Sequence, residues 1–329
     1  MIKHIAIIGL GSIGQRHLRL VRELRPEIRI TIVRSSKGKK TDEEKYADDV
    51  CYYLEDAIES GIQAAIISNP AIYHVRETIK LMKASIHVLV EKPLSHTMEN
   101  IYKLLEIEKI SGVVGLIGYC LRYDPAAIKF REILHNEKTG QILHAKIDCS
   151  SYLPVWRPGK DYRQSVSARK ELGGGVLLEL SHEQDYIRWF FGNMESVHAS
   201  LSNSGTLDID VEDSADMIFK SKEGYAVTAH LDFNCRNFRR ICSARCTEGE
   251  LIWDAVMQEV TWRPADGSAE VERFEHERDF IYRAQLKHFF DCIEQNQTPV
   301  IALKEGVAVM RMIEAVKESN ALGKTVALT

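Results

Sequence analysis

The feature that most constrains the fold lies at the start of the chain, where a short apolar run leads directly into a glycine-rich segment. Ile5–Ile8 are consecutive apolar residues, as in a strand buried on both faces, and Gly9, Gly11 and Gly14 follow in GxGxxG spacing. The helical run Ile13–Leu24 comes next. This order of strand, glycine loop and helix predicts a dinucleotide-binding Rossmann unit.

Each glycine has its own physical reason. Gly9 permits the tight turn out of the strand, Gly11 lets the backbone approach a pyrophosphate, and Gly14 lets the helix pack close to the sheet. The first N–H groups of the helix, including those of Ser12 and Ile13, then face the phosphates. Three glycines in a loop can also form nothing more than a turn. Their place between a buried strand and a helix favours the nucleotide site.

Length and charge set the limits for the rest of the chain. A chain of 329 residues buries a large core and is expected to form two domains. The net charge of −4 and the 27% of charged residues argue against a surface for nucleic acid or anionic membrane. We find no apolar run near the roughly 20 residues of a membrane span. The first residues lack the order of a signal peptide, so a cytoplasmic protein is expected.

The cysteine pattern predicts no metal site. The seven cysteines are odd in number, scattered, and include no CxxC pair. Cys242 and Cys246 have a metal-like spacing, but neither a second pair nor a nearby histidine completes a site. Reduced structural thiols are the preferred interpretation.

Strand and helix patterns alternate along the first third of the chain. Short apolar runs occur at Ile28–Val33, Ala64–Ser68, His87–Val90 and Val113–Gly118, with helical segments between them. This alternation predicts a parallel, doubly wound sheet.

The end of the second predicted strand bears on the choice of cofactor. An NAD site usually places Asp or Glu there, to accept hydrogen bonds from the ribose 2′-hydroxyl. This chain instead has Arg34, Ser35, Ser36 and Lys37, and two cations with two hydroxyls suit a 2′-phosphate. NADP(H) is therefore favoured over NAD(H). Two alternatives stay open: the cofactor is NAD(H), or the segment is a solvated basic loop.

Two further strand ends carry polar residues. Ligands of doubly wound sheets bind at the carboxyl ends of the strands. We expect Asn69 to approach the cofactor there, although an Asn-Pro turn explains the same residues. The candidate cofactor-binding residues at these ends are Ser68, Asn69, Pro70, Glu91 and Lys92.

The pattern changes in the second part of the chain. From Ala145 onward the apolar residues alternate with polar ones in longer strands, which is typical of a large sheet with one face covered. We expect residues 1–121 to form the dinucleotide-binding domain and residues 122–329 to form an α+β domain for substrate binding and dimerisation.

Three segments together resemble the Gfo/Idh/MocA family of NAD(P)-dependent oxidoreductases: the glycine loop, NPAIYH ending at His74, and HVLVEKPLSHT. The resemblance covers nearly the whole chain, including the hairpin segment Thr247–Leu251 and two closing helices. It implies a Rossmann domain followed by a predominantly antiparallel, open-faced sheet, and a homodimer or homotetramer. It adds His74 to the cofactor-binding candidates. It also implies that Lys92 lies beside the nicotinamide and polarises the substrate oxygen.

The segment Gly173–Gly192 resembles the family's helix that carries an acid and a histidine for proton transfer. Glu179 stands at the acid position, and His182 and Asp185 keep the family's separation, but Glu179 and His182 are three residues apart where the family has four. Both spacings place the pair on neighbouring turns of one helix face. Two alternatives stay open: the deletion lies nearer the glycines, or Glu183 replaces the histidine. We favour a structural role for Asp185.

A long irregular segment, residues 151–170, precedes that helix. Long loops in compact domains are usually functional. Aromatic side chains suit the apolar face of a sugar, and arginines suit a carboxylate or phosphate, so an anionic sugar is the preferred substrate class. A solvated surface loop is the alternative, and Arg122 is either a substrate contact or an interdomain salt-bridge partner. The candidate substrate-binding residues are Arg122, Trp156, Arg157, Tyr162 and Arg163.

These features together predict an oxidoreductase of carbohydrate metabolism that transfers hydride between NADP(H) and a hydroxyl or ketone carbon of a sugar-like substrate. Lys92 polarises the oxygen and His182 relays the proton, with Glu179 or Glu183 tuning them. A redox-neutral lyase or hydrolase with tightly bound NAD(P) is one alternative. A non-catalytic NADP(H)-binding regulatory protein is the other, supported by the shortened spacing between Glu179 and His182.

Overall fold

The computed structural model describes residues 1–35 and 40–328, and they form two compact units. Unit 1 comprises Met1–Cys120 and Arg278–Met310, and unit 2 comprises Leu121–Glu277 and Arg311–Thr329. The predicted domain boundary between residues 121 and 122 places all of residues 122–329 in the second domain. The first of the two closing helices instead belongs to unit 1.

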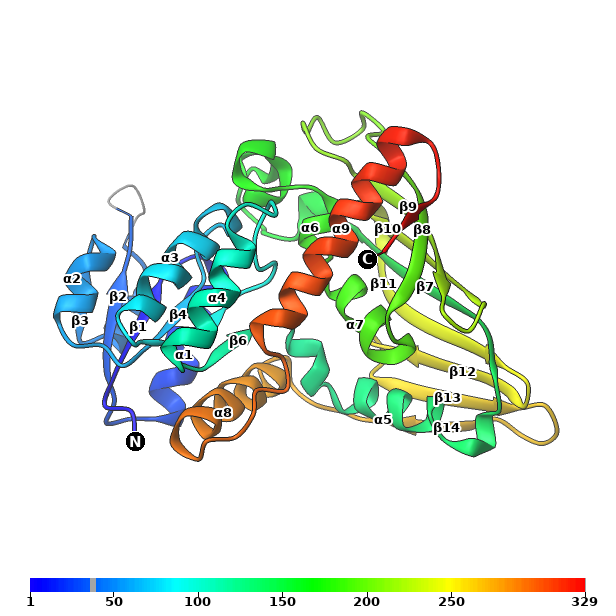
Figure 1. Ribbon diagram of the computed structural model, residues 1–329, viewed down its shortest axis with the longest axis horizontal. Coiled ribbons are helices and arrows are strands. Elements are labelled where there is room, and N and C mark those ends of the chain that lie inside the picture. The colour runs from blue at the N-terminus through cyan, green and yellow to red at the C-terminus, as the bar shows by residue number, and fades with distance from the viewer. Residues whose placement is uncertain (36–39, 329) are drawn as a thin grey trace. The chain divides into compact units, whose positions relative to one another are not determined.

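Unit 1 is built on a six-stranded parallel sheet in the order β3-β2-β1-β4-β5-β6 (Figure 1). Its order steps outward from β1 in both directions, which is the doubly wound topology expected from the alternation of strands and helices. The strands are β1 (His4–Ile8), β2 (Arg29–Val33), β3 (Asp49–Cys51), β4 (Ala64–Ile67), β5 (His87–Val90) and β6 (Gly115–Ile117).

The helices of unit 1 cover both faces of this sheet (Figure 1). One core cluster joins Ile5 and Ile7 of β1, Leu18 of α1 and Phe289 of α8, and all four are fully buried. Residues from the two ends of the unit therefore share one apolar core. The helices are α1 (Ser12–Leu24), α2 (Leu54–Glu59), α3 (Ala71–Lys83), α4 (Ile101–Ser111), α8 (Phe280–Glu294) and the 3₁₀ turn η1 (Asp42–Tyr46).

Unit 2 contains a nine-stranded sheet in the order β14-β13-β12-β11-β7-β10-β9-β8-β15, in which only the β7–β10 pair is parallel among the described strands. The predicted fold class, a Rossmann domain with a second, predominantly antiparallel sheet, is confirmed. The strands are β7 (Ile142–Tyr152), β8 (Met194–Ser202), β9 (Ser214–Ser221), β10 (Ala226–Asp232), β11 (Asn234–Cys246), β12 (Gly249–Asp254), β13 (Glu259–Pro264), β14 (Glu270–Arg273) and β15 (Val326–Ala327).

Helices pack on one face of this second sheet (Figure 1). Phe130 of α5 and Phe190 of α7 have ring centroids 4.8 Å apart, and Tyr186 of α7 meets Trp253 of β12 edge-on at 5.3 Å. The helices are α5 (Pro125–Leu134), α6 (Val176–Glu179), α7 (His182–Phe191) and α9 (Leu303–Leu322), whose residues from Arg311 belong to this unit. The short 3₁₀ turns are η2 (Cys120–Tyr123), η3 (Glu137–Thr139), η4 (Leu153–Val155), η5 (Tyr162–Gln164), η6 (Val166–Ala168) and η7 (Lys170–Leu172).

The predicted single helix within Gly173–Gly192 is two helices. α6 ends at Glu179, Leu180 leaves the helical conformation with φ −98° and ψ 34°, and α7 begins at His182. Residue spacing on one continuous helix therefore does not describe how Glu179 and His182 are related. The break makes His182 the first residue of α7.

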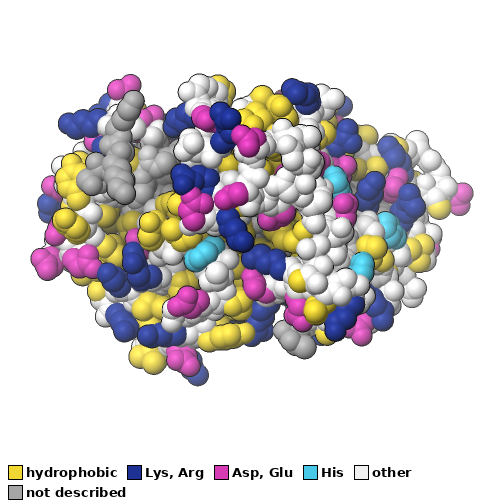
Figure 2. Space-filling model, turned by 90° about the horizontal axis from the view of Figure 1, so that it is seen from above, with side chains coloured by type: hydrophobic (Ala, Val, Ile, Leu, Met, Phe, Trp, Pro, Cys, Tyr) yellow, Lys and Arg dark blue, Asp and Glu magenta, His cyan; other side chains and the backbone are white. Residues whose placement is uncertain are grey.

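The surface carries charges of both signs. Figure 2 shows Lys and Arg side chains interspersed with Asp and Glu over the face in view, in keeping with the small net charge. In the described part of the chain, the helices all fall short of the length and apolar character that crossing a bilayer requires.

Candidate active site

The glycine loop after β1 has the geometry that its spacing predicts. Gly9 has φ +86°, and its N–H donates to Val33 O at 2.8 Å. A Cβ on Gly14 would lie 2.0 Å from Gly9 O, so only glycine fits there. A Cβ on Gly11 would meet nothing within 4 Å. Gly11 thus borders open space at the start of α1.

The start of α1 fits a pyrophosphate group. The N-cap residue Gly11 makes no side-chain cap, and the first N–H groups of a helix have no acceptor within the helix. Those groups, from Ser12, Ile13 and Gly14, therefore stand beside the open space at Gly11, where they favour a bound anion.

The segment after β2 holds Arg34 in an internal ion pair. Arg34 is 9% exposed, and its guanidinium donates to the carboxylate of Glu44 in η1. The same carboxylate accepts the N–H of Thr41 at 2.9 Å. Ser35 is exposed, whereas the other two predicted contacts, Ser36 and Lys37, lie outside the described residues.

The end of β4 is bonded to the glycine loop. Ser68 Oγ lies 2.9 Å from Ile8 O and 2.8 Å from Gly9 O, to which it donates, and Pro70 is the N-cap of α3. Asn69 Nδ2 donates to Glu77 Oε2 at 2.7 Å. Asn69 Oδ1 is buried and accepts no hydrogen bond from the described residues. Its amide is therefore oriented by Glu77, with the oxygen left for another donor.

The end of β5 places Lys92 beside a buried carboxylate. Glu91 is 6% exposed, and its Oε1 accepts a hydrogen bond from His17 Nε2 at 2.7 Å. Its Oε2 accepts the N–H of Lys92 at 3.3 Å. A Cβ on Gly118 would come within 3.0 Å of the same carboxyl group, so glycine leaves the room that Glu91 occupies.

His17 was not predicted as a site residue. It is fully buried on α1, three residues after Gly14. A histidine on the apolar face of the helix that follows a glycine loop was the signal available in the sequence. Its partner Glu91 is 74 residues away, so the pair itself was not readable from local spacing.

His74, a predicted cofactor-binding residue, contacts the backbone through both ring nitrogens. Its Nδ1 lies 2.8 Å from Pro93 O and its Nε2 lies 2.8 Å from Asn69 O. The side chain is 1% exposed, and this burial lowers the pKa of His74, although both carbonyl contacts oppose the shift. His74 therefore joins the segments that follow β4 and β5.

In unit 2, two ion pairs hold α7: one is buried on both sides, and in the other the carboxylate is buried and the arginine is partly exposed. Arg122 donates to both carboxylate oxygens of Asp185, with Nε–Oδ2 2.9 Å and Nη2–Oδ1 2.7 Å. Arg240 Nε on β11 donates to Glu183 Oε1 at 2.8 Å, and Glu183 is fully buried. His182 lies beside these pairs at the start of the helix and is half-buried, as is Glu179 at the end of α6.

The predicted substrate-binding loop makes several contacts within unit 2. Trp156 Nε1 donates to Ser151 Oγ at 3.1 Å, and Tyr162 OH donates to Leu207 O at 2.8 Å. Arg163 pairs with Asp161 at 2.9 Å. The Arg157 carbonyl accepts the N–H of Lys160 at 3.2 Å. Among the described residues, Arg157 is the candidate arginine for whose side chain the structure gives neither a hydrogen bond nor an ion pair.

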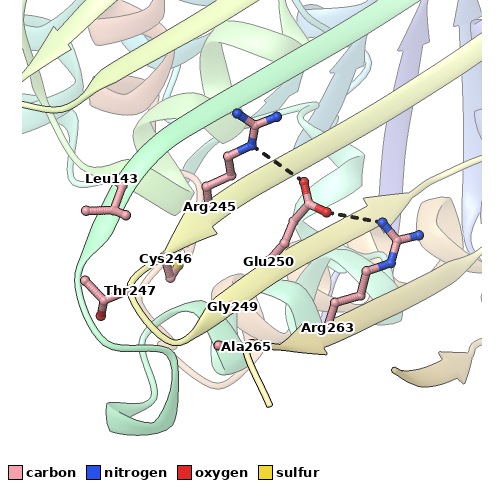
Figure 3. A pocket seen from close by; sticks show the side chains of 8 residues that line it. All are labelled: Leu143, Arg245, Cys246, Thr247, Gly249, Glu250, Arg263 and Ala265. Atoms are coloured by element: carbon pink, nitrogen blue, oxygen red, sulfur yellow. Dashed lines mark hydrogen bonds and ion pairs between the residues drawn. The ribbon is translucent and has the colours of Figure 1, made fainter. Parts of the chain in front are cut away.

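A shallow pocket on β11–β13 lies elsewhere in unit 2 (Figure 3). Glu250 lies between Arg245 and Arg263, at 3.9 and 3.2 Å, and both arginines are more than half exposed. Of the described residues lining it, none is a predicted site residue. Exposed pairs of this kind contribute little stability, and we assign the pocket no role.

Comparisons with known proteins bear on the whole chain. Residues 3–119 match the model of an oxidoreductase family with an NAD-binding Rossmann fold, and residues 128–252 match the GFO/IDH/MocA C-terminal domain. The 1,5-anhydro-D-fructose reductase of Ensifer adhaerens is 26% identical over 81% of this chain and 80% of its own length. The scyllo-inositol 2-dehydrogenase (NAD(+)) of Bacillus subtilis (strain 168) is 24% identical over 90% of this chain and 87% of its own.

A solved structure shares the fold over almost the full length. Levoglucosan dehydrogenase in complex with NADH superposes with a TM-score of 0.89 at 18% identity, covering 99% of both chains. Both family models match, one in each half of the chain, and the glycine loop has the geometry of a dinucleotide site. The chain therefore belongs to the Gfo/Idh/MocA family of oxidoreductases.

Proposed function

We propose that this oxidoreductase transfers hydride between NADP(H) and a hydroxyl or ketone carbon of a sugar-like, anionic substrate. The observation that carries the proposal is the placement of Lys92 at the carboxyl end of β5, in the same sheet whose β1 leads into the glycine loop. Cofactors of doubly wound sheets bind at that edge. When bound, the nicotinamide accepts or supplies the hydride.

The proposed cofactor preference rests on the segment after β2. Arg34 stands where an NAD site usually has an acidic residue that accepts from the ribose hydroxyls. The Glu44 carboxylate that pairs with Arg34 competes with a 2′-phosphate for the same guanidinium. We therefore propose NADP(H) as the preferred cofactor with a moderate margin over NAD(H), and Glu44 as the residue that limits this margin.

The proposed catalytic roles follow from charge and burial. The Lys92 ammonium donates a hydrogen bond to the substrate oxygen and stabilises negative charge that develops on it. His182, half-buried at the start of α7, takes or gives the hydroxyl proton. We prefer His182 to Glu183 for this role because Glu183 is fully buried and paired with Arg240. Glu179 is proposed to tune the histidine.

The proposed substrate class rests on the loop before α6 and on the relatives. Arginine binds carboxylate or phosphate through a planar pair of donors, and Arg157 is the candidate that we assign to this contact. The similar proteins are named for anhydrofructose, scyllo-inositol and levoglucosan, which are all sugars or cyclic polyols. We further propose a cytoplasmic homodimer or homotetramer, on the family resemblance.

The first test is fluorescence titration of the protein with NADPH and NADH, repeated with Arg34→Asp and Glu44→Gln. We expect tighter NADPH binding in the parent protein, loss of that preference in Arg34→Asp, and a larger preference in Glu44→Gln. Equal binding of both cofactors by all three proteins would remove the NADP(H) preference.

The second test follows absorbance of the reduced cofactor during turnover of a panel of sugars, sugar acids and inositols. Lys92→Ala and His182→Ala should each lower kcat by roughly 10²-fold or more, the range typical of a lost acid–base or oxyanion-stabilising group. Arg157→Lys should raise KM for anionic substrates and leave neutral ones unaffected. Unchanged turnover in both Lys92→Ala and His182→Ala would refute the mechanism.

A further inference from the structure

The segment that carries Lys92 leaves the sheet just before that residue. β5 ends at Val90, and the N–H of Glu91 still donates to Ile67 O at 2.9 Å. Beyond it, Pro93 has no N–H and can donate nothing to a neighbouring strand. Sheet pairing therefore anchors the segment only on its N-terminal side, and other contacts must hold the remainder.

Two buried histidines contact the residues that precede and follow Lys92 in the chain. His17 Nε2 donates to the Glu91 carboxylate, which also accepts the N–H of Lys92. His74 Nδ1 lies 2.8 Å from Pro93 O on the other side. His17 is fully buried and His74 is 1% exposed, so solvent does not compete for these bonds.

We propose that His17 and His74 are positioning residues that hold the Glu91–Pro93 segment so that Lys92 presents its ammonium to the substrate oxygen. The inference rests on the proposed function, because it assumes that Lys92 acts on the substrate. Neither histidine touches the reacting atoms in this assignment. Each acts through the backbone or through Glu91.

The two histidines also join this segment to the cofactor-binding loops. His17 belongs to α1, whose first turn faces the open space at Gly11, and the second ring nitrogen of His74 meets Asn69 O after β4. A displacement of the glycine loop or of Asn69 is thereby transmitted to Lys92. Misplacing a catalytic group by about 1 Å lowers rate by as much as 10²-fold.

The nitrogens used by the two histidines differ, which gives a crossed test. Gln carries its amide nitrogen at the position of histidine Nε2, and Asn carries it at the position of Nδ1. His17 uses Nε2 toward Glu91, so His17→Gln keeps that donor and His17→Asn removes it. His74 places Nδ1 toward Pro93 O, so His74→Asn keeps a nitrogen facing that carbonyl and His74→Gln does not.

The experiment measures kcat, the Kd for NADPH and the ¹³C chemical shift of methylated Lys92 in all four variants of the full chain. Lys92 is observed by ¹³C NMR after reductive methylation, with its signal assigned by its absence from Lys92→Arg. We expect His17→Asn and His74→Gln to lower kcat by about 10- to 100-fold, and His17→Gln and His74→Asn by less than about threefold. The Kd for NADPH should change by less than about threefold throughout.

The NMR readout does not depend on knowing the substrate. His17→Asn and His74→Gln should change the ¹³C chemical shift of the methylated Lys92 ammonium from its value in the parent protein, and the other two variants should leave it unchanged. Because each substitution type is disruptive at one histidine and conservative at the other, a general effect of Asn or Gln cannot produce the crossed pattern.

Two results separate the failure of this inference from the failure of the proposed function. If all four variants behave alike in both readouts while Lys92→Ala abolishes turnover, the positioning role is wrong and the catalytic lysine stands. If Lys92→Ala leaves turnover unchanged, the proposed function fails; the assigned role of the two histidines toward the substrate oxygen then fails with it.

Discussion

The two candidate catalytic residues are held by different physical means. In unit 1, Lys92 follows the end of a strand, and buried histidines contact the two residues that flank it. One histidine contacts the Glu91 carboxylate and the other contacts Pro93 O. In unit 2, His182 begins a helix that two ion pairs hold, Arg122–Asp185 and Arg240–Glu183. The support of Lys92 relies mainly on backbone geometry and hydrogen bonds, whereas the support of His182 relies on paired charges.

This difference predicts different responses to substitution. Breaking a buried ion pair leaves an uncompensated charge, which costs about 3–5 kcal/mol. A lost hydrogen bond of ordinary strength costs about 0.5–1.5 kcal/mol. Substitutions in the ion pairs that hold α7 should therefore destabilise unit 2, whereas substitutions of His17 or His74 should leave unit 1 folded while its site loses precision.

The largest effect is expected for Arg122→Met, which leaves the Asp185 carboxylate buried at 1% exposure without its bidentate partner. The free energy of unfolding of unit 2 should fall by about 3–5 kcal/mol, measured by urea denaturation. Adding Asp185→Asn should recover part of this loss because it removes the buried charge that Arg122 neutralises.

Arg163→Met is the matched control for that substitution. Arg163 pairs with Asp161 at the surface, with side chains 50% and 40% exposed, so its loss should lower the free energy of unfolding far less than the loss of Arg122. Equal losses for the Arg122 and Arg163 variants would show that burial of the pair does not govern the stability of unit 2.

Unit 1 contains a carboxyl group, that of Glu108, whose burial is only partly offset by a nearby positive charge. Burial raises the pKa of Glu108 on α4 to about 7, and Lys304 offsets only part of the shift. The folded pKa of Glu108 lies above the ordinary value of 4.5, so the folded state holds this proton more tightly than the unfolded state does. The stability that this proton contributes is complete below about pH 4.5 and is lost as pH rises through 7. The expected loss is on the order of 2–3 kcal/mol.

Glu108→Gln tests this pH dependence. The variant should lose the fall in stability between about pH 4.5 and 7 that the parent protein shows, measured by urea denaturation at each pH. Glu106→Gln, an exposed position on the same helix, serves as the control. A parent-like pH profile in Glu108→Gln would assign the effect to another group.

The glycine loop offers a sharper test of unit 1. A Cβ on Gly14 would lie 2.0 Å from Gly9 O, a backbone atom that cannot move without moving β1, so Gly14→Ala should destabilise unit 1 by about 1–3 kcal/mol. A Cβ on Gly11 meets open space at φ −69°, so Gly11→Ala should change stability by less than about 1 kcal/mol.

Gly11→Ala, the substitution with little expected effect on stability, should have a large effect on cofactor binding. Gly11→Ala should weaken NADPH binding by about tenfold or more while the melting temperature stays near that of the parent, because the added methyl group occupies the space of the pyrophosphate. Unchanged NADPH affinity in Gly11→Ala would mean that the cofactor does not approach the loop at this point.

The sequence predicted the features that local patterns record and missed those that depend on contacts between distant parts of the chain. The glycine loop, the alternation of strands and helices, and the longer alternating strands from Ala145 onward are all local patterns of period or spacing, and they agree with the sheets observed. The packing of α8 on the core of unit 1 joins residues far apart in the chain, and nothing local in the helix records it.

The same reasoning applies to the candidate site. Lys92 and His182 were identified by resemblance at fixed motif positions, whereas their supports were not. His17 and Arg240 act on Glu91 and Glu183, residues 74 and 57 positions away. The break between α6 and α7 was also missed, because Leu180 and Ser181 carry neither the glycine nor the proline that usually marks a helix end.

The smallest effect is expected at an exposed charge cluster on β9 and β10 of unit 2. Hydrogen bonds to Asp232 and Asp216 raise the pKa of His230 to about 9, against burial. Because the folded pKa is raised above 6.5, the stabilisation is complete below about pH 6.5 and is lost as pH rises through 9. His230 is 40% exposed, so solvent and salt reduce it to about 1 kcal/mol or less.

His230→Gln should therefore be less stable than the parent at pH 6 and equal to it at pH 10, and 1 M NaCl should shrink the difference at pH 6. His198→Gln, at an exposed histidine on the neighbouring β8, is the matched control and should show no such crossover. A salt-independent loss larger than about 2 kcal/mol at pH 6 would place His230 among the buried pairs such as Arg122–Asp185. Exposed and buried charges in unit 2 would then stabilise the fold equally, and burial could no longer explain why α7 depends on its two ion pairs.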